Sequence, residues 1–224
     1  MTRRPASPPR SSRRLDWREA EFAALDFETT GLDLRRDAVV SFGLVPVLGG
    51  RIDLSTAVYQ EVAPDVPLSH RSITIHHIRP IDLVEAPALG DVIHLLRTSL
   101  EGRYLLAWSA DIEASFLARA FGGRVRKWMS RTIDVLRLAV LADRLEGRDT
   151  PERSYTLAEC VARAGVPVEE AHDALNDALM TAEMFLVLAA RLGPFGIHDV
   201  RSLARPARVS LDRSLRAARR KGRP

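Results

Sequence analysis

The sequence predicts an α/β fold with a mixed sheet of about five strands flanked by helices. Three short apolar runs rich in valine, leucine and phenylalanine come first, and helical patterns with one further strand-like run follow them. Strands followed by alternating helices and strands are typical of an α/β protein. A length of 224 residues suits one such domain with a substantial core.

The expected strands lie mostly in the first third of the chain. Residues 22–28 form a short apolar run that ends at a Thr-Thr-Gly segment, and residues 38–48 form a second run that ends at Gly49-Gly50. We expect these two runs and residues 56–62 to form a meander joined by short turns. Residues 104–108 are expected to add a further buried strand.

The expected helices follow, and the last of them is the longest. Pro87 is placed at a helix start, followed by apolar residues at helical spacing up to Leu100. Phe116 and Leu117 belong to a second helix, which the pair Gly122-Gly123 ends. Further helices are predicted over residues 133–145, 156–164 and 174–192. In the last of these, the candidate inward positions are Ala178, Thr181, Phe185 and Leu188.

The charge distribution suggests three regions: a basic, disordered segment over 1–20, a folded domain over 21–195 and a basic tail over 196–224. Residues 1–14 carry +5 and residues 201–224 carry +8, whereas the whole chain carries +4, so residues 15–200 carry −9. Nucleic acid would be repelled by an acidic body unless some of its acids hold metal ions. The basic ends fit either solubilising segments or tethers for phosphate groups.

Composition narrows the setting of the protein. Cys160 is the single cysteine, which excludes an internal disulfide and a cysteine cluster for zinc. No apolar stretch approaches the ~20 residues of a membrane span, and the basic start lacks the apolar segment of a secretory signal. We therefore expect a cytoplasmic protein with no membrane partner.

Two carboxylates stand out in the first predicted strand. Asp26 and Glu28 are two residues apart, so their side chains point to the same face of a strand. Carboxylates within an apolar strand are costly to bury unless a cation compensates their charge, and Mg²⁺ prefers oxygen ligands. By itself the pair also fits a half-exposed edge strand with two solvated acids.

A second group lies at the start of the longest predicted helix, in the segment from His172 to Asp177. We place His172 in the loop before the helix and Asp173 at its N-cap. The imidazole can then turn toward the same side as Asp177, one turn inside the helix. A lone histidine before a helix is usually a surface residue, but its combination with Asp26 and Glu28 favours a site.

Together, the segments Asp26-Phe-Glu-Thr-Thr-Gly-Leu32 and His172-x-Ala-x-x-Asp177 resemble the motifs of the DEDDh 3′-5′ exonucleases. This superfamily has an RNase H-like fold and includes the epsilon subunit of bacterial DNA polymerase III and ribonuclease T. The similarity runs from about residue 22 to residue 192. It includes Ile75-His-His-Ile78, which resembles the Ile-His-Gly-Ile segment of the family.

The middle motif departs from the family pattern. The family usually shows His-Asn-x-x-Phe-Asp-x-x-Phe-Leu, in which the aspartate is a metal ligand, whereas this chain has Trp108-Ser-Ala-Asp-Ile-Glu-Ala-Ser-Phe-Leu117. Aligning Phe116 and Leu117 places Glu113 at the ligand position, and their spacing fixes its position on the helix. We favour Glu113 over Asp111, which is expected to point elsewhere or to cap the helix.

The resemblance implies a metal-dependent mechanism and a set of residue roles. Two divalent ions, Mg²⁺ or Mn²⁺, would lie ~4 Å apart. The residues that would hold them are Asp26, Glu28, Glu113 and Asp177. His172 would act as the general base on the attacking water. Thr29, Leu32 and His76 would line the pocket for the terminal nucleotide.

The implied function is removal of nucleoside monophosphates from a nucleic-acid 3′ end. The Asp-x-Glu-Thr-Thr-Gly form of the first motif favours single-stranded DNA, as in the polymerase-associated branch, and leaves a DNA polymerase as a candidate partner. RNA trimming is an alternative. A second alternative, motivated by the altered middle motif, is a catalytically weakened fold that binds nucleic acid or a polymerase.

Overall fold

The sheet of the computed structural model contains six strands. The structure describes residues 4–6, 14–31, 33–148, 155–169 and 172–205. The strands are β1 (Phe22–Thr29), β2 (Val39–Leu48), β3 (Arg51–Ile52), β4 (Val58–Glu61), β5 (Tyr104–Ala107) and β6 (Thr132–Asp134). Their order is β3-β2-β1-β5-β6, and β4 pairs with β2 beside β3. Because β1 is antiparallel to β2 but parallel to β5, the sheet is mixed, as predicted.

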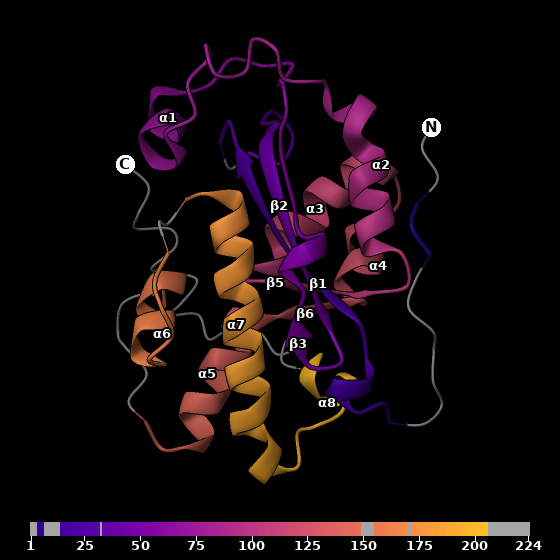
Figure 1. Cartoon of the computed structure of the whole chain (residues 1–224), viewed down its shortest axis with the longest axis vertical. Coiled ribbons are helices and arrows are strands. Elements are labelled where there is room, and N and C mark those ends of the chain that lie inside the picture. Colours follow the sequence, from indigo (N-terminus) through magenta and orange to yellow (C-terminus); the bar gives the residue numbers. More distant parts are fainter. Residues whose placement is uncertain (1–3, 7–13, 32, 149–154, 170–171, 206–224) are drawn as a thin grey trace.

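Helices lie on both faces of this sheet. The α-helices are α1 (His70–His76), α2 (Leu89–Leu100), α3 (Ala110–Phe121), α4 (Val125–Met129), α5 (Val135–Leu145), α6 (Leu157–Arg163), α7 (Ala174–Leu192) and α8 (Val200–Leu203). Three short 3-10 turns, η1 (Trp17–Glu19), η2 (Leu54–Thr56) and η3 (Gly193–Phe195), complete the elements of the described residues. In Figure 1, α5 and α6 lie beside α7, and α2, α3 and α4 lie across the sheet from them.

The strand β1 separates two hydrophobic clusters. Phe22 and Ala24 pack with α5, α6 and α7, whereas Ala23, Leu25 and Phe27 pack with α2, α3 and α4. This alternation follows from the two-residue period of a strand. By the same period, residues 26 and 28 continue the face that α7 covers.

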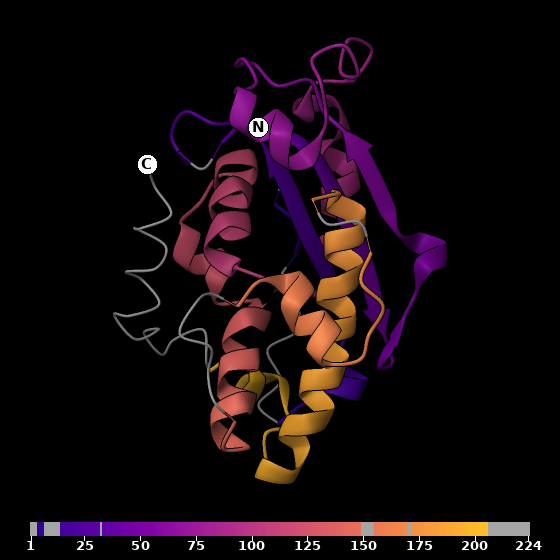
Figure 2. The same ribbon diagram turned by 90° about the vertical axis from the view of Figure 1, so that its left-hand side faces the viewer.

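The helix α7 is the central element of its layer, and its bounds are those predicted. The four inward positions predicted for it are fully buried, and Phe185 packs on Phe22 with ring centroids 4.7 Å apart. Figure 2 shows α7 running along the sheet. By length and composition alone, Ala174–Phe195 could cross a membrane, contrary to the expectation above, but half of its apolar 18-residue window is buried against the rest of the fold. The segment therefore fits the core helix of a folded domain.

The packed body extends beyond the predicted limits 21–195. Trp17 is 5% exposed and packs edge-on against Phe185, and Val200 and Leu203 are buried in the same cluster. A β-bridge between Asp16 and Asp199 joins the two flanking segments. Residues 16–20 and 197–203 therefore belong to the folded domain, because their apolar side chains complete its core. Residues 206–224 of the predicted tail lie outside the described residues.

Local differences from the sequence predictions include the following three. Ile133 lies in β6 and not in a helix, because residues 132–134 pair with β5 before Asp134 caps α5. The helix α1 was not expected, and its N-cap is Ser69. Pro87 precedes the helix start, since Ala88 is the N-cap of α2.

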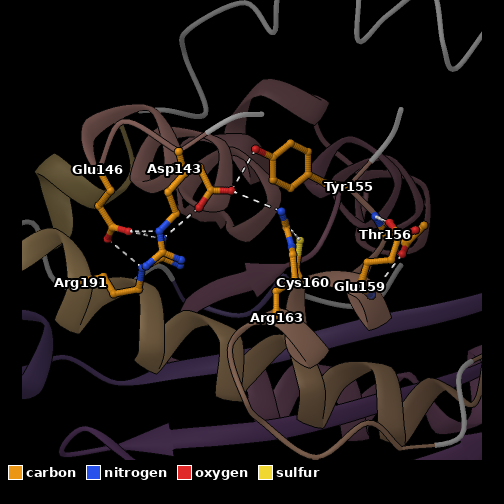
Figure 3. A network of polar contacts seen from close by, with 9 residues as sticks. Asp143, Glu146, Tyr155, Thr156, Glu159, Cys160, Arg163 and Arg191 are labelled. Atoms are coloured by element: carbon orange, nitrogen blue, oxygen red, sulfur yellow. Dashed lines mark hydrogen bonds and ion pairs between the residues drawn. The ribbon is translucent and has the colours of Figure 1, made fainter. Parts of the chain in front are cut away.

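A partly buried ion-pair network joins α5, α6 and α7 (Figure 3). Arg191 of α7 donates to Asp143 at 2.9 Å and to Glu146 at 2.7 and 2.9 Å. The hydroxyl of Tyr155 donates to the other oxygen of Asp143 at 3.0 Å, and Arg163 lies 3.7 Å from that oxygen. Because the Asp143 side chain is only 7% exposed, it depends on these partners for its negative charge.

Replacing Arg191 with alanine is expected to lower the free energy of unfolding by about 3 kcal/mol, because Asp143 and Glu146 would keep their charges without this partner. Arg148→Ala is the matched control. Arg148 also pairs with Glu146, but its side chain is 59% exposed, so a change within about 0.5 kcal/mol is expected. Equal effects of the two substitutions in chemical denaturation would contradict the role given to this network.

Candidate active site

The first part of the candidate site lies near the end of β1. Asp26 is half-buried, and Glu28 is 8% exposed. In the sheet, Asp26 lies opposite Gly43 of β2 and Glu28 lies opposite Ser41. β1 is an interior strand, because β2 pairs along its length and β5 pairs with residues 22–24, so the alternative of an edge strand is wrong.

The second part lies at the start of α7. Asp173 is the N-cap, and its carboxylate accepts the backbone N–H groups of Leu175 and Asn176 at 3.0 Å, as predicted. His172 precedes the cap with φ 68°, a left-handed conformation that is uncommon for a residue other than glycine. Its backbone N–H donates to Asp177 at 3.3 Å. This turn directs the chain back over the first helical turn, where Asp177 lies.

The two parts converge. One ligand atom from each of Glu28, His172 and Asp177 lies within 4.8 Å of the others. Glu28 is more than 140 positions from His172 and Asp177 in the sequence, and the packing of α7 on β1 and β2 brings them together. Carboxylate oxygens with one imidazole nitrogen are a donor set that divalent cations accept.

The electrostatics of this group show an excess of negative charge. Burial raises the pKa of Asp26 well above its usual range, and the charges of Asp177 and Asp173 add to this effect. Burial, followed by the charge of Asp26, raises the pKa of Glu28 to about 9. Burial also raises the pKa of Asp177 to about 6, although the hydrogen bond from the His172 backbone lowers it in part. A bound divalent cation would relieve this crowding of carboxylates.

The two acids of the middle motif have different environments. Glu113 is 4% exposed in the first turn of α3, whereas the Asp111 side chain is 58% exposed and lies 3.9 Å from Arg137. Asp111 does not cap α3, because Ser109 is the N-cap. The burial of Glu113 fits the preference for it as a ligand, and its assignment as a ligand stays a prediction.

The residues predicted to line the nucleotide pocket are described in part. Thr29 is buried and its hydroxyl donates to the carbonyl of Gly31 at 2.7 Å. His76 is 6% exposed, and its Nδ1 accepts the N–H of Ile78 at 3.1 Å. Burial lowers the pKa of His76, which favours the neutral ring with its proton on Nε2. Leu32 lies outside the described residues.

Sequence reasoning overlooked two contributors to the site. Asp173 was predicted only as a cap, but its charge raises the pKa of both Asp26 and Glu28. Gly43 was not singled out, although a glycine inside a strand can mark the close approach of another backbone. Here the backbone that approaches is the start of α7.

Comparison with known proteins identifies the family. The model of the RNase_T exonuclease family matches residues 23–185, which include β1, α3 and the start of α7. The chain belongs to this exonuclease family. It is therefore a member of the 3′-5′ exonuclease hydrolases, as the two motifs predicted.

Similar proteins include parts of replicative polymerases. The exonuclease is 31% identical over 181 residues to the DNA polymerase III PolC-type of Thermotoga maritima, a match that covers 80% of this chain and 12% of that protein. It is 25% identical over 202 residues to the DNA polymerase III subunit epsilon of Treponema pallidum, covering 88% and 89% of the two chains. The exonuclease thus spans about an eighth of the PolC-type relatives and most of the epsilon subunit.

Solved structures confirm the RNase H-like fold. E. coli Exonuclease I in complex with a dA16 oligonucleotide superposes with a TM-score of 0.65 at 20% identity, covering 78% of the exonuclease and 42% of that chain. Exonuclease X in complex with 5′ overhanging duplex DNA gives 0.58 at 23% identity, covering 83% and 99%.

Proposed function

We propose that this exonuclease removes nucleoside monophosphates from the 3′ end of single-stranded DNA, and that it depends on divalent metal ions. The observation that carries the proposal is the convergence of Glu28, His172 and Asp177 within 4.8 Å, beside Asp26. Such a group of buried and half-buried acids next to a histidine suits hydrolysis of a phosphodiester, which needs bound cations and a base.

The donor set fits hard divalent cations. Asp26, Glu28 and Asp177 offer carboxylate oxygens, and Glu113 on α3 is a further acid, which is buried. Mg²⁺ and Mn²⁺ prefer oxygen ligands. When bound, the two ions would activate a water and stabilise the charge that develops on the departing 3′ oxygen.

His172 is proposed as the general base. Its ring lies on an exposed turn next to Glu28 and Asp177, so it can reach both the site and bulk water. An imidazole in this position can accept a proton from the attacking water and pass it to solvent.

Neutral His76 and buried Thr29 are proposed to contact the terminal nucleotide. The Nε2 of His76 is a buried donor without a hydrogen-bond partner among the residues that the structure describes. An unsatisfied buried donor of this kind is costly, and a substrate oxygen would remove the cost. Leu32 follows Gly31 in the sequence and is proposed to join this pocket, as the family resemblance implies.

DNA is proposed as the substrate because several relatives are named as DNA polymerase III proteins and solved neighbours hold DNA. The test uses matched 5′-labelled DNA and RNA oligonucleotides with Mg²⁺, Mn²⁺ or a chelator. We expect stepwise shortening from the 3′ end, only with metal and faster on DNA by at least about tenfold. Faster shortening of RNA would assign the enzyme to RNA trimming. Binding to either strand without metal-dependent cleavage would favour a non-catalytic binding module.

Replacing each acid of the middle motif in turn tests which of them is the fourth metal ligand. Glu113→Gln is expected to reduce kcat/KM about 10²-fold, because a neutral amide of the same shape cannot compensate cationic charge. Asp111→Asn is the matched control and should keep the rate within about threefold, because the exposed Asp111 side chain faces Arg137. A larger loss in the Asp111 variant would reverse the assignment.

A further inference from the structure

The start of α7 touches the sheet at one glycine. A Cβ atom on Gly43 would lie 2.1 Å from the carbonyl oxygen of Ala174, 2.3 Å from its carbonyl carbon and 2.4 Å from the backbone nitrogen of Leu175. Real Cβ contacts are essentially never shorter than 3.0 Å. The obstacle is backbone, so no side-chain rotation can make room for the added atom.

This contact lies between the two halves of the proposed site. Gly43 is opposite Asp26 in the β1–β2 ladder. On the other side of the contact, Ala174 directly follows the N-cap Asp173 and belongs to the same first turn as Asp177. The distance from β2 to the start of α7 therefore determines how far Asp177 lies from Asp26.

Two other glycines of the described chain have free space where a Cβ atom would lie. At Gly90 and Gly193, a Cβ atom would meet nothing within 4 Å. Gly193 is the C-cap of the same helix, α7, and has ordinary right-handed helical angles. It offers a control for the addition of one methyl group at the opposite end of α7.

We propose that Gly43 is a positioning residue of this exonuclease, which allows α7 to approach the sheet closely enough for Asp177 to join Asp26 and Glu28 in one metal site, with the base His172 beside it. The inference rests on the proposed function for its chemical consequence. Its geometrical part, the position of α7 relative to β2, does not depend on catalysis.

The test compares Gly43→Ala and Gly193→Ala with the unmodified protein. Because the start of α7 must move by about 1 Å, and a misplacement of that size can cost 10²-fold in rate, kcat/KM of the Gly43 variant is expected to fall about 10²-fold.

Mg²⁺ demands near-ideal octahedral geometry, whereas Ca²⁺ tolerates irregular coordination. In calorimetric titrations with each metal alone, we expect Mg²⁺ affinity to fall by roughly 10- to 100-fold and Ca²⁺ affinity to fall by less than about threefold. The Gly193 variant should match the unmodified protein throughout.

Crystal structures separate the inference from the proposed function. Metal-free Gly43→Ala should show the start of α7 displaced from β2, and an unmoved helix would overturn the inference whatever the activity. Equal losses of Mg²⁺ and Ca²⁺ affinity would also overturn it, since they would indicate general damage. If the variant does not fold, the test is a structure of the unmodified protein with Mg²⁺. Room for a Cβ atom between Gly43 and the start of α7 in that structure would refute the inference. Failure of the unmodified protein to bind Mg²⁺ or to cut would instead refute the proposed function.

Discussion

Asp26→Asn is expected to lower kcat/KM at least about 10³-fold while making the metal-free protein more stable. Burial raises the pKa of Asp26, and the charges of Asp177 and Asp173 raise it further. Asparagine has nearly the same shape but no charge. It therefore removes an anionic metal ligand and, at the same time, one source of repulsion, which is worth on the order of 1 kcal/mol at pH 8.

In this variant, activity is expected to fall while the stability of the metal-free protein rises. A variant that lost activity through misfolding would lose stability as well, and thermal denaturation with and without Mg²⁺ separates the two cases. Asp111→Asn removes an acid of the same size from an exposed position and should leave activity nearly unchanged. If the Asp26 variant retained more than a tenth of the normal rate, the assignment of Asp26 as a metal ligand would be wrong.

The second large effect is a loss of stability of the metal-free protein as the pH rises. Glu28 has a usual pKa of 4.5, which burial and the charge of Asp26 raise to about 9, and burial raises the pKa of Asp177 to about 6. Between these usual and raised values the folded protein binds more protons than the unfolded chain. The stability that these protons provide is therefore complete at low pH and is lost as the pH rises through about 6 and then about 9.

We expect the free energy of unfolding of the metal-free protein to fall by on the order of 5 kcal/mol between about pH 5 and pH 9. Mg²⁺ should restore this loss, because cations replace protons as compensation for the carboxylates, so stabilisation by Mg²⁺ should increase with pH. Denaturation curves at several pH values, with Mg²⁺ or a chelator, measure both quantities. The dependence should be smaller in Asp26→Asn, and a metal-free protein that became more stable over this pH range would contradict the account of the site.

Several features of the exonuclease follow from residues that are close together in the sequence. The bounds of α7 were predicted as observed, because an apolar stripe at helical spacing and the N-cap Asp173 are local signals. The capping box of Thr156 and Glu159 likewise starts α6 where the helical pattern begins. The same holds for Asp26 and Glu28, whose shared face is a consequence of strand geometry alone.

Other features depended on partners far away in the chain. Ile133 has the apolar neighbours of a helix, but pairing with β5 places it in β6. Trp17 and Leu203 belong to segments that the charge pattern assigned to the basic ends, and only the core around Phe185 explains their burial. The preference for Glu113 over Asp111 came from motif alignment, and the structure adds a physical contrast between a buried and an exposed acid.

The sequence by itself determined the strand of Asp26 and Glu28, the helix of Asp177 with its N-cap Asp173, and the family of the enzyme. Only the tertiary structure decided how closely those elements meet, which includes the charge that Asp173 contributes and the contact of Gly43 with the start of α7. The physical reason is that periodicity and capping depend on neighbouring residues, whereas the spacing between β1 and α7 results from packing between segments more than a hundred residues apart.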